Sequence, residues 1–74
     1  MMVRVKTLWE ERQQGQRRLM GFHVMVVYPG GSEDTFEVKT LRINGEKVTV
    51  PEFDYYIFKA TEVMVKGEEA KIYT

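Results

Sequence analysis

The chain has 74 residues, of which 30% are charged, and its eleven Lys and Arg balance eleven Asp and Glu. A chain of this length predicts one domain, residues 1–74, which buries only about 60% of the surface of its unfolded form. It has no cysteine, which excludes disulfides, thiolate metal sites and a cysteine nucleophile.

The first part of the chain predicts a long β-hairpin. Residues 3–9 alternate between a nonpolar and a charged face, which is typical of a half-buried strand. Residues 10–18 are polar around a central glycine and form the predicted tip of the hairpin. Residues 19–28 return as a second strand, in which Gly21 indicates a bulge or a close backbone approach.

This second strand is nonpolar on both of its faces. We expect one face to carry Met20, Phe22, Val24, Val26 and Tyr28, and the other to carry Leu19, Gly21, His23, Met25 and Val27. The protein's own core can cover one face. The other face then needs the far wall of a barrel or another molecule.

A third strand is expected at residues 35–43, after the turn formed by residues 29–32. Its nonpolar residues change face between Val38 and Leu41. A strand that keeps these residues buried needs a bulge or a bend near Thr40.

The dipeptide Asn44-Gly45 predicts a two-residue hairpin turn of type I′, because both of its central residues need positive φ. Such a turn places Leu41 opposite Val48 and Lys39 opposite Val50.

Residues 51–62 fit two structures. Nonpolar residues recur at helical spacing after Pro51, which suits the first position of a helix. The same stretch is rich in aromatic residues, which favour strands. We predict a short helical turn near residues 51–56, with residues 51–60 as the outer limits of any helix, then a strand from about Ile57 to Lys66 and a last strand over residues 70–74.

These elements predict a mainly β fold, a small five- to six-stranded antiparallel barrel or sandwich with one short helix. The order of its hairpins resembles an SH3-like or OB-like barrel in outline. That resemblance is architectural and implies no function.

No motif in the chain indicates catalysis. His23 is the one side chain whose ordinary pKa is near neutrality, but a histidine on a nonpolar strand more often packs or lies at an interface. The neighbouring acidic pairs fall in predicted turns, where both carboxylates are solvated. We therefore expect no enzyme activity, no cofactor and no metal site.

The surplus of nonpolar side chains instead predicts a protein–protein interaction or assembly module. Tyr, Phe and Met are favoured at interfaces, and self-association is the economical way to bury such a surplus. The predicted interface residues are Leu19, His23, Met25, Val27, Tyr55, Tyr56 and Phe58. We expect a cytoplasmic homo-oligomer that has no membrane segment and that would suit a viral or mobile-element accessory protein.

The alternative hypothesis is a nucleic-acid-binding small barrel that uses the hairpin tip, residues 10–18. Arginine binds phosphate in a bidentate manner, and an aromatic side chain at the base of the hairpin offers a stacking surface. The residues expected to act are Arg12, Gln14, Arg17, Arg18 and Trp9.

Overall fold

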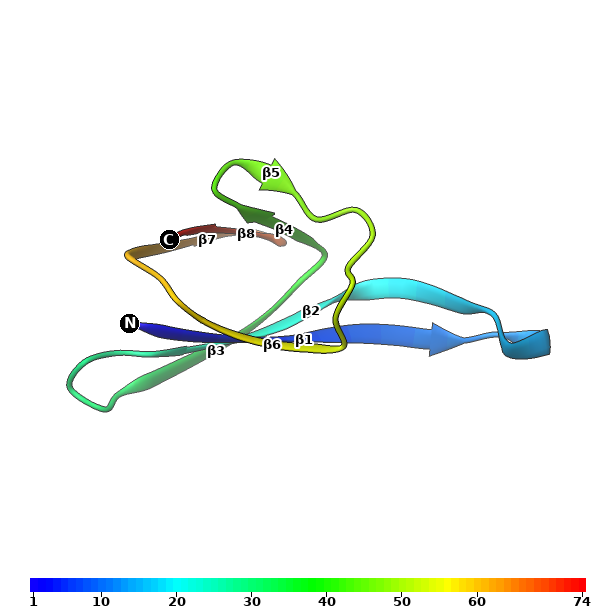
Figure 1. The fold of residues 1–74 in the computed structure, drawn as a ribbon, viewed down its shortest axis with the longest axis horizontal. Coiled ribbons are helices and arrows are strands. Elements are labelled where there is room, and N and C mark those ends of the chain that lie inside the picture. Colours follow the sequence, from blue (N-terminus) through cyan, green and yellow to red (C-terminus); the bar gives the residue numbers. More distant parts are fainter.

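The structure, a computed structural model, describes residues 1–74 and consists of two four-stranded β-sheets (Figure 1). The strands are β1 Met2–Glu11, β2 Arg17–Val27, β3 Glu33–Val38, β4 Thr40–Ile43, β5 Glu46–Lys47, β6 Tyr55–Lys59, β7 Glu62–Lys66 and β8 Glu69–Tyr73. Sheet A has the strand order β3-β2-β1-β6, and sheet B has the order β5-β4-β8-β7. The predicted mainly β class is confirmed.

Three details of the predicted fold are wrong, namely the number of strands, the antiparallel pairing throughout and the short helix. The chain forms eight strands rather than five or six, and β4 pairs with β8 in parallel. Strand pairing does not close the two sheets into a barrel, so the predicted choice of barrel or sandwich is not confirmed. No helix forms near residues 51–60, because residues 55–59 pair with β1 as β6, and the one helical segment is a 3-10 turn at Gln13–Gly15.

The long hairpin is confirmed as β1 and β2, joined by the 3-10 turn. Residues 8–21 of this hairpin pair with neither β3 nor β6, and they extend beyond the other strands as an arm (Figure 1). The molecule is therefore elongated, with extents of 45 × 23 × 22 Å.

The structure shows both features expected at Gly21, a β-bulge and a close backbone approach. Leu8 pairs with Gly21 but Trp9 pairs with Leu19, so Met20 is the extra residue of a β-bulge. Gly21 has a φ of 152°, and a Cβ atom at this position would collide with the carbonyl oxygen of Val38. A side chain at residue 21 is therefore excluded by both backbone conformation and space.

The bulge reverses the expected orientation of the residues that precede it. Leu19 shares the face of Trp9 and packs against the core, whereas Met20 is exposed. The expectations that Leu19 shares a face with Met25, and Met20 with Phe22, are wrong because one inserted residue exchanges the two faces of a strand.

The core lies between the two sheets and draws on both of them. Alternate residues of β1 and β2 face sheet B, which contributes its own nonpolar residues from β4 and β8. The buried nonpolar residues are Val3, Val5, Phe22, Val24, Val26, Val38, Leu41, Ala60, Ala70 and Ile72.

The predicted bend near Thr40 is confirmed. The chain leaves sheet A after Val38, bends at Lys39 and enters sheet B at Thr40. The change of sheet explains the change of face, since Val38 and Leu41 both remain buried in the shared core.

The predicted type I′ turn is also confirmed. Asn44 and Gly45 have φ values of 52° and 84°, and the Val48 N–H donates to the Leu41 carbonyl at 2.9 Å. The pairing of Lys39 with Val50 does not form, because β5 has only two residues.

Candidate protein interface

The outer face of sheet A is the face that points away from sheet B. It consists of the residues that alternate with the buried positions of β1 and β2, together with their partners on β3 and β6. From β3 to β6, the three rows of this face are Glu33, Val27, Met2 and Lys59; Thr35, Met25, Arg4 and Ile57; and Glu37, His23, Lys6 and Tyr55. No element of the chain covers this face in Figure 1.

Nonpolar and charged side chains are unevenly distributed over this face. Met25 and Val27 are half-buried, and the exposed cations Arg4 and Lys6 follow on β1. The most exposed nonpolar residues of the face lie on β6, where Ile57 is 48% exposed. The uncovered nonpolar surface is therefore concentrated at one margin of the sheet.

His23 lies between Lys6 and Glu37 in the register of this face. Its Nδ1 is 3.8 Å from the Glu37 Oε1, which forms an ion pair when the imidazole is protonated. The contact joins β2 to β3 at an exposed position.

Strand β6 pairs with β1 on one side only. The Thr7 N–H donates to the Asp54 carbonyl at 2.9 Å, and the Ala60 N–H donates to the Met1 carbonyl at 2.8 Å. Hydrogen bonds of an antiparallel pair recur at every second residue, so the even-numbered residues of β6 bond to β1. The N–H and C=O groups of residues 55, 57 and 59 therefore point to the free edge.

Aromatic rings extend this margin onto the inner side of sheet A. Tyr56 lies 5.2 Å from Phe53 and 5.0 Å from Phe58 between ring centroids. Phe58 packs against the core, whereas Tyr56 remains 45% exposed. The stack therefore leaves one tyrosine ring accessible beside the free edge of β6.

The residues predicted to form an interface thus divide between two faces. His23, Met25, Val27 and Tyr55 share the outer face of sheet A, and Leu19, Tyr56 and Phe58 lie on the inner side. The sequence-based prediction did not name Ile57 among the interface residues, although Ile57 lies within the aromatic segment that was assigned to the interface. Ile57 is exposed because the odd-numbered residues of β6 point to the outer face. The helical spacing of residues 53–60 gave no indication of this alternation.

The other sheet edges carry acidic residues, which β6 lacks. Charged side chains on an edge strand oppose pairing with a foreign strand. The charged residues are Glu33, Asp34 and Glu37 on β3, Glu46 and Lys47 on β5, and Glu62 and Lys66 on β7. On β6 the only charge is Lys59, at the end of the strand.

The residues predicted to bind nucleic acid are brought together on the arm, where Arg12 and Arg17 form ion pairs with acidic residues of the same chain. Trp9 Nε1 donates to Asp54 Oδ1 at 2.8 Å. The Arg17 guanidinium lies 4.5 Å from the centroid of the Trp9 ring and 3.5 Å from the same carboxylate oxygen. This cluster ties the base of the arm to the segment that leads into β6.

Acidic residues accompany the remaining cations of the arm. Arg12 is 3.8 Å from Glu10, which also lies opposite Arg18 in the register. Gln14 lies in the 3-10 turn with a φ of 65°. The positive charge of the arm is consequently offset along most of its length.

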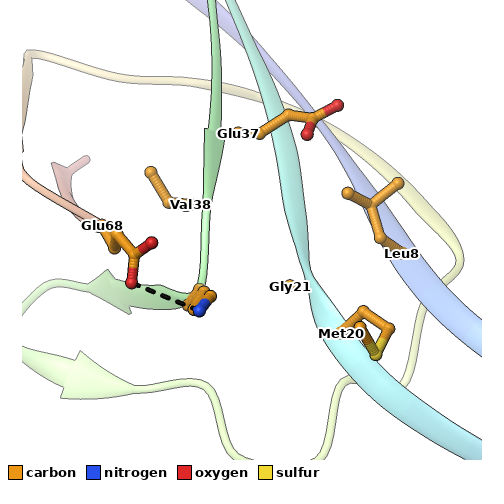
Figure 2. Close-up of a pocket in the computed structure, with 7 residues that line it drawn as sticks. Leu8, Met20, Gly21, Glu37, Val38 and Glu68 are labelled. Carbon is orange, nitrogen blue, oxygen red and sulfur yellow. Dashed lines mark ion pairs between the residues drawn. The ribbon is translucent and has the colours of Figure 1, made fainter.

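The largest hollow in the surface adjoins the bulge. It has a volume of about 280 Å³, just below the range of about 300–1,000 Å³ for small-molecule sites. Figure 2 shows Leu8 and Met20 beside Gly21 and the ion pair of Glu68 with Lys39, whose charged atoms are 3.6 Å apart. The hollow thus combines nonpolar side chains near Gly21 with an ion pair and the further carboxylate of Glu37.

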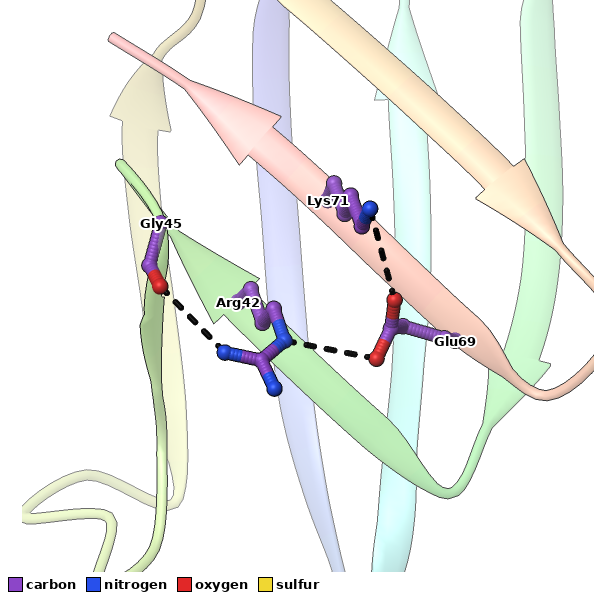
Figure 3. Close-up of polar contacts among 4 residues, drawn as sticks. All are labelled: Arg42, Gly45, Glu69 and Lys71. Carbon is purple, nitrogen blue, oxygen red and sulfur yellow. Dashed lines mark hydrogen bonds and ion pairs between the residues drawn. The ribbon is translucent and has the colours of Figure 1, made fainter.

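Polar side chains on the outer face of sheet B bond one another. Glu69 accepts from Arg42 at 3.4 Å and lies 3.8 Å from Lys71, and Arg42 also donates to the Gly45 carbonyl at 3.3 Å (Figure 3). One carboxylate therefore links the parallel strands β4 and β8.

A further polar contact lies beyond the end of β2. The Tyr28 hydroxyl donates to Asp34 Oδ2 at 2.9 Å. This hydrogen bond, together with desolvation and the negative charge of Asp34, raises the pKa of Tyr28 above its ordinary value.

No group of three or more His, Asp or Glu lies close enough to hold a metal ion. The structure contains no helix with the length and nonpolar character needed to cross a membrane. Comparisons with protein-family models, with curated proteins and with solved structures each gave no match.

Proposed function

We propose that this protein is a non-catalytic assembly module that associates with copies of itself through the β6 margin of sheet A. The observation that carries the proposal is the run of three consecutive exposed nonpolar residues on a free edge strand. Tyr55, Tyr56 and Ile57 are 54%, 45% and 48% exposed. Exposed nonpolar side chains on both sides of an unpaired edge strand make that edge a template for pairing with another chain.

The small size of the chain also favours association. Ten buried nonpolar residues form the core, and domains of this length usually gain stability from a partner when disulfides and metals are absent. Burial of the β6 side chains would add about 25 cal/mol for each Å² of nonpolar surface removed from water. Assembly would therefore stabilise the fold as well as perform the function.

Binding of nucleic acid by the arm has weaker support. Phosphate binding needs cations that are free to reach the backbone of the nucleic acid, whereas Arg12 and Arg17 are ion-paired with Glu10 and Asp54. A gel shift at low salt that disappears when Arg12, Arg17 and Arg18 are changed to Ala would favour this alternative.

Light scattering over a range of protein concentrations tests the assembly proposal. We expect the wild-type protein to form a defined oligomer and the Tyr55→Glu variant to associate more weakly. Met64→Glu is the matched control, because Met64 is 50% exposed on sheet B. A wild-type protein that stays monomeric at all concentrations, or equal effects of both variants, would refute the proposal.

A further inference from the structure

We propose that β6 pairs antiparallel with β6 of a second copy about a two-fold axis at Ile57, so that two copies of sheet A join into one continuous sheet. This inference rests on the proposed assembly function and supplies its geometry. It follows from the backbone of the free edge, the register of its side chains and the charges on the other edges.

The backbone of β6 is suited to an antiparallel partner. The N–H and C=O groups of residues 55, 57 and 59 all point away from β1, as the bonds at both ends of the strand show. A register centred on Ile57 places residue 55 of one copy opposite residue 59 of the other. It is the antiparallel self-pairing that overlaps all five residues of β6 and gives every free edge group a partner.

Side chains match in the same register. Tyr56 lies opposite Phe58 of the second copy, an aromatic cross-strand pair of the kind that stabilises antiparallel sheets. Ile57 lies opposite its own symmetry mate. Lys59 lies opposite Tyr55 of the second copy, so no like charges face each other.

Other registers overlap fewer residues of β6, and a centre at Tyr56, for example, leaves Phe58 and Lys59 without a partner in the second β6. A centre at Lys59 places two ammonium groups directly opposite each other, which is destabilising. A centre at Phe58 places Lys59 opposite Ile57 and moves Tyr55 beyond the end of the partner strand. The sequence of β6 therefore favours the register centred on Ile57.

The charges on the other edges explain why the partner strand is a second β6. Edge strands β3, β5 and β7 all carry acidic residues, and such charges hinder pairing. Edge strand β7 also has a nonpolar centre, Val63–Val65, but it carries a charge at each end, whereas β6 has one charge and no acidic residue. A second copy is therefore the occupant that the structure itself supplies.

Opposite charges at the two-fold axis provide a direct test. Ile57→Lys and Ile57→Glu each place like charges opposite each other when the variant pairs with itself, so we expect each to self-associate on the order of tenfold more weakly than the wild type. An equimolar mixture places unlike charges opposite each other and should recover association as a heterodimer. Met64→Lys and Met64→Glu, at a similarly exposed site on sheet B, should leave association unchanged.

The outcomes separate this inference from the proposed function. A wild-type oligomer whose Ile57 variants assemble normally, or whose mixed variants stay monomeric, overturns the β6 pairing but leaves self-association standing, and the Tyr55→Glu variant then decides whether the β6 margin takes part in it. A monomeric wild type overturns both. Amide hydrogen exchange of the wild-type protein gives a second test that needs no variant: the amides of residues 55, 57 and 59 should become protected as concentration rises, and unchanged exchange would overturn the pairing.

Discussion

The substitution Gly21→Ala tests how the bulge positions β2 against the rest of the fold. Gly21 is buried, with a φ of 152°, a conformation that residues with a Cβ atom rarely adopt. The added methyl group would also meet the carbonyl oxygen of Val38, a backbone atom that cannot rotate away. Backbone strain and overpacking therefore act together at this one position.

Both contributions can be given a magnitude. A residue held in a sparsely populated region of φ and ψ costs about 1–3 kcal/mol, and overpacking of a well-filled site costs about 1–3 kcal/mol. Together they amount to about 2–6 kcal/mol. A domain of 74 residues has a free energy of unfolding of about 4–11 kcal/mol, so the variant should be largely destabilised.

Urea denaturation of Gly21→Ala and Gly67→Ala separates the two contributions. Gly67 also has a positive φ, of 60°, but no atom lies within 4 Å of the position that a Cβ atom would occupy there, so its substitution should cost only the strain, about 1–2 kcal/mol. If Gly21→Ala lowers the free energy of unfolding no more than Gly67→Ala does, the close approach to Val38 has no energetic weight and the reasoning fails.

Two further predictions concern single hydrogen bonds. Thr7→Val should lower the free energy of unfolding by about 1–2 kcal/mol, because the buried Thr7 hydroxyl donates to the Phe53 carbonyl at 2.7 Å; urea denaturation should show less than about 0.5 kcal/mol for the exposed control Thr49→Val. Asp34→Asn should lower the pKa of Tyr28 towards its ordinary value, since the carboxylate raises it in the wild type. A raised pKa means that the folded state favours the neutral phenol, so this contribution to stability is present at neutral pH and is lost as pH rises through the folded-state pKa of Tyr28. An NMR titration of the tyrosine rings measures the shift, and an unchanged pKa of Tyr28 in Asp34→Asn would contradict the assignment.

Local patterns in the sequence predicted several elements correctly. The alternation of residues 3–9 and 19–28 indicated the long hairpin, Asn44-Gly45 indicated a type I′ turn, and Gly21 indicated the bulge. These signals succeed because each depends on the conformational preferences of a few neighbouring residues.

Residues 51–60 show where such signals fail. Their nonpolar residues recur at helical spacing, yet residues 55–59 form β6 because β1 offers an edge that their backbone groups can bond. Strand propensity depends strongly on this tertiary context. The prediction of the face on which Leu19 lies was wrong for a related reason. A glycine indicates a bulge but does not show which residue is inserted.

The sequence by itself determined that the chain is mainly β, and it located most of the strands and turns, because period-two patterns and turn residues act over short distances. Only the tertiary structure decided the parallel pairing of β4 with β8 and the free edge at β6. Both depend on contacts between residues far apart in the chain, such as Leu41 with Ala70. No local pattern encodes which strands lie at the edges of the sheets, and one of these edge strands, β6, carries the proposed interface.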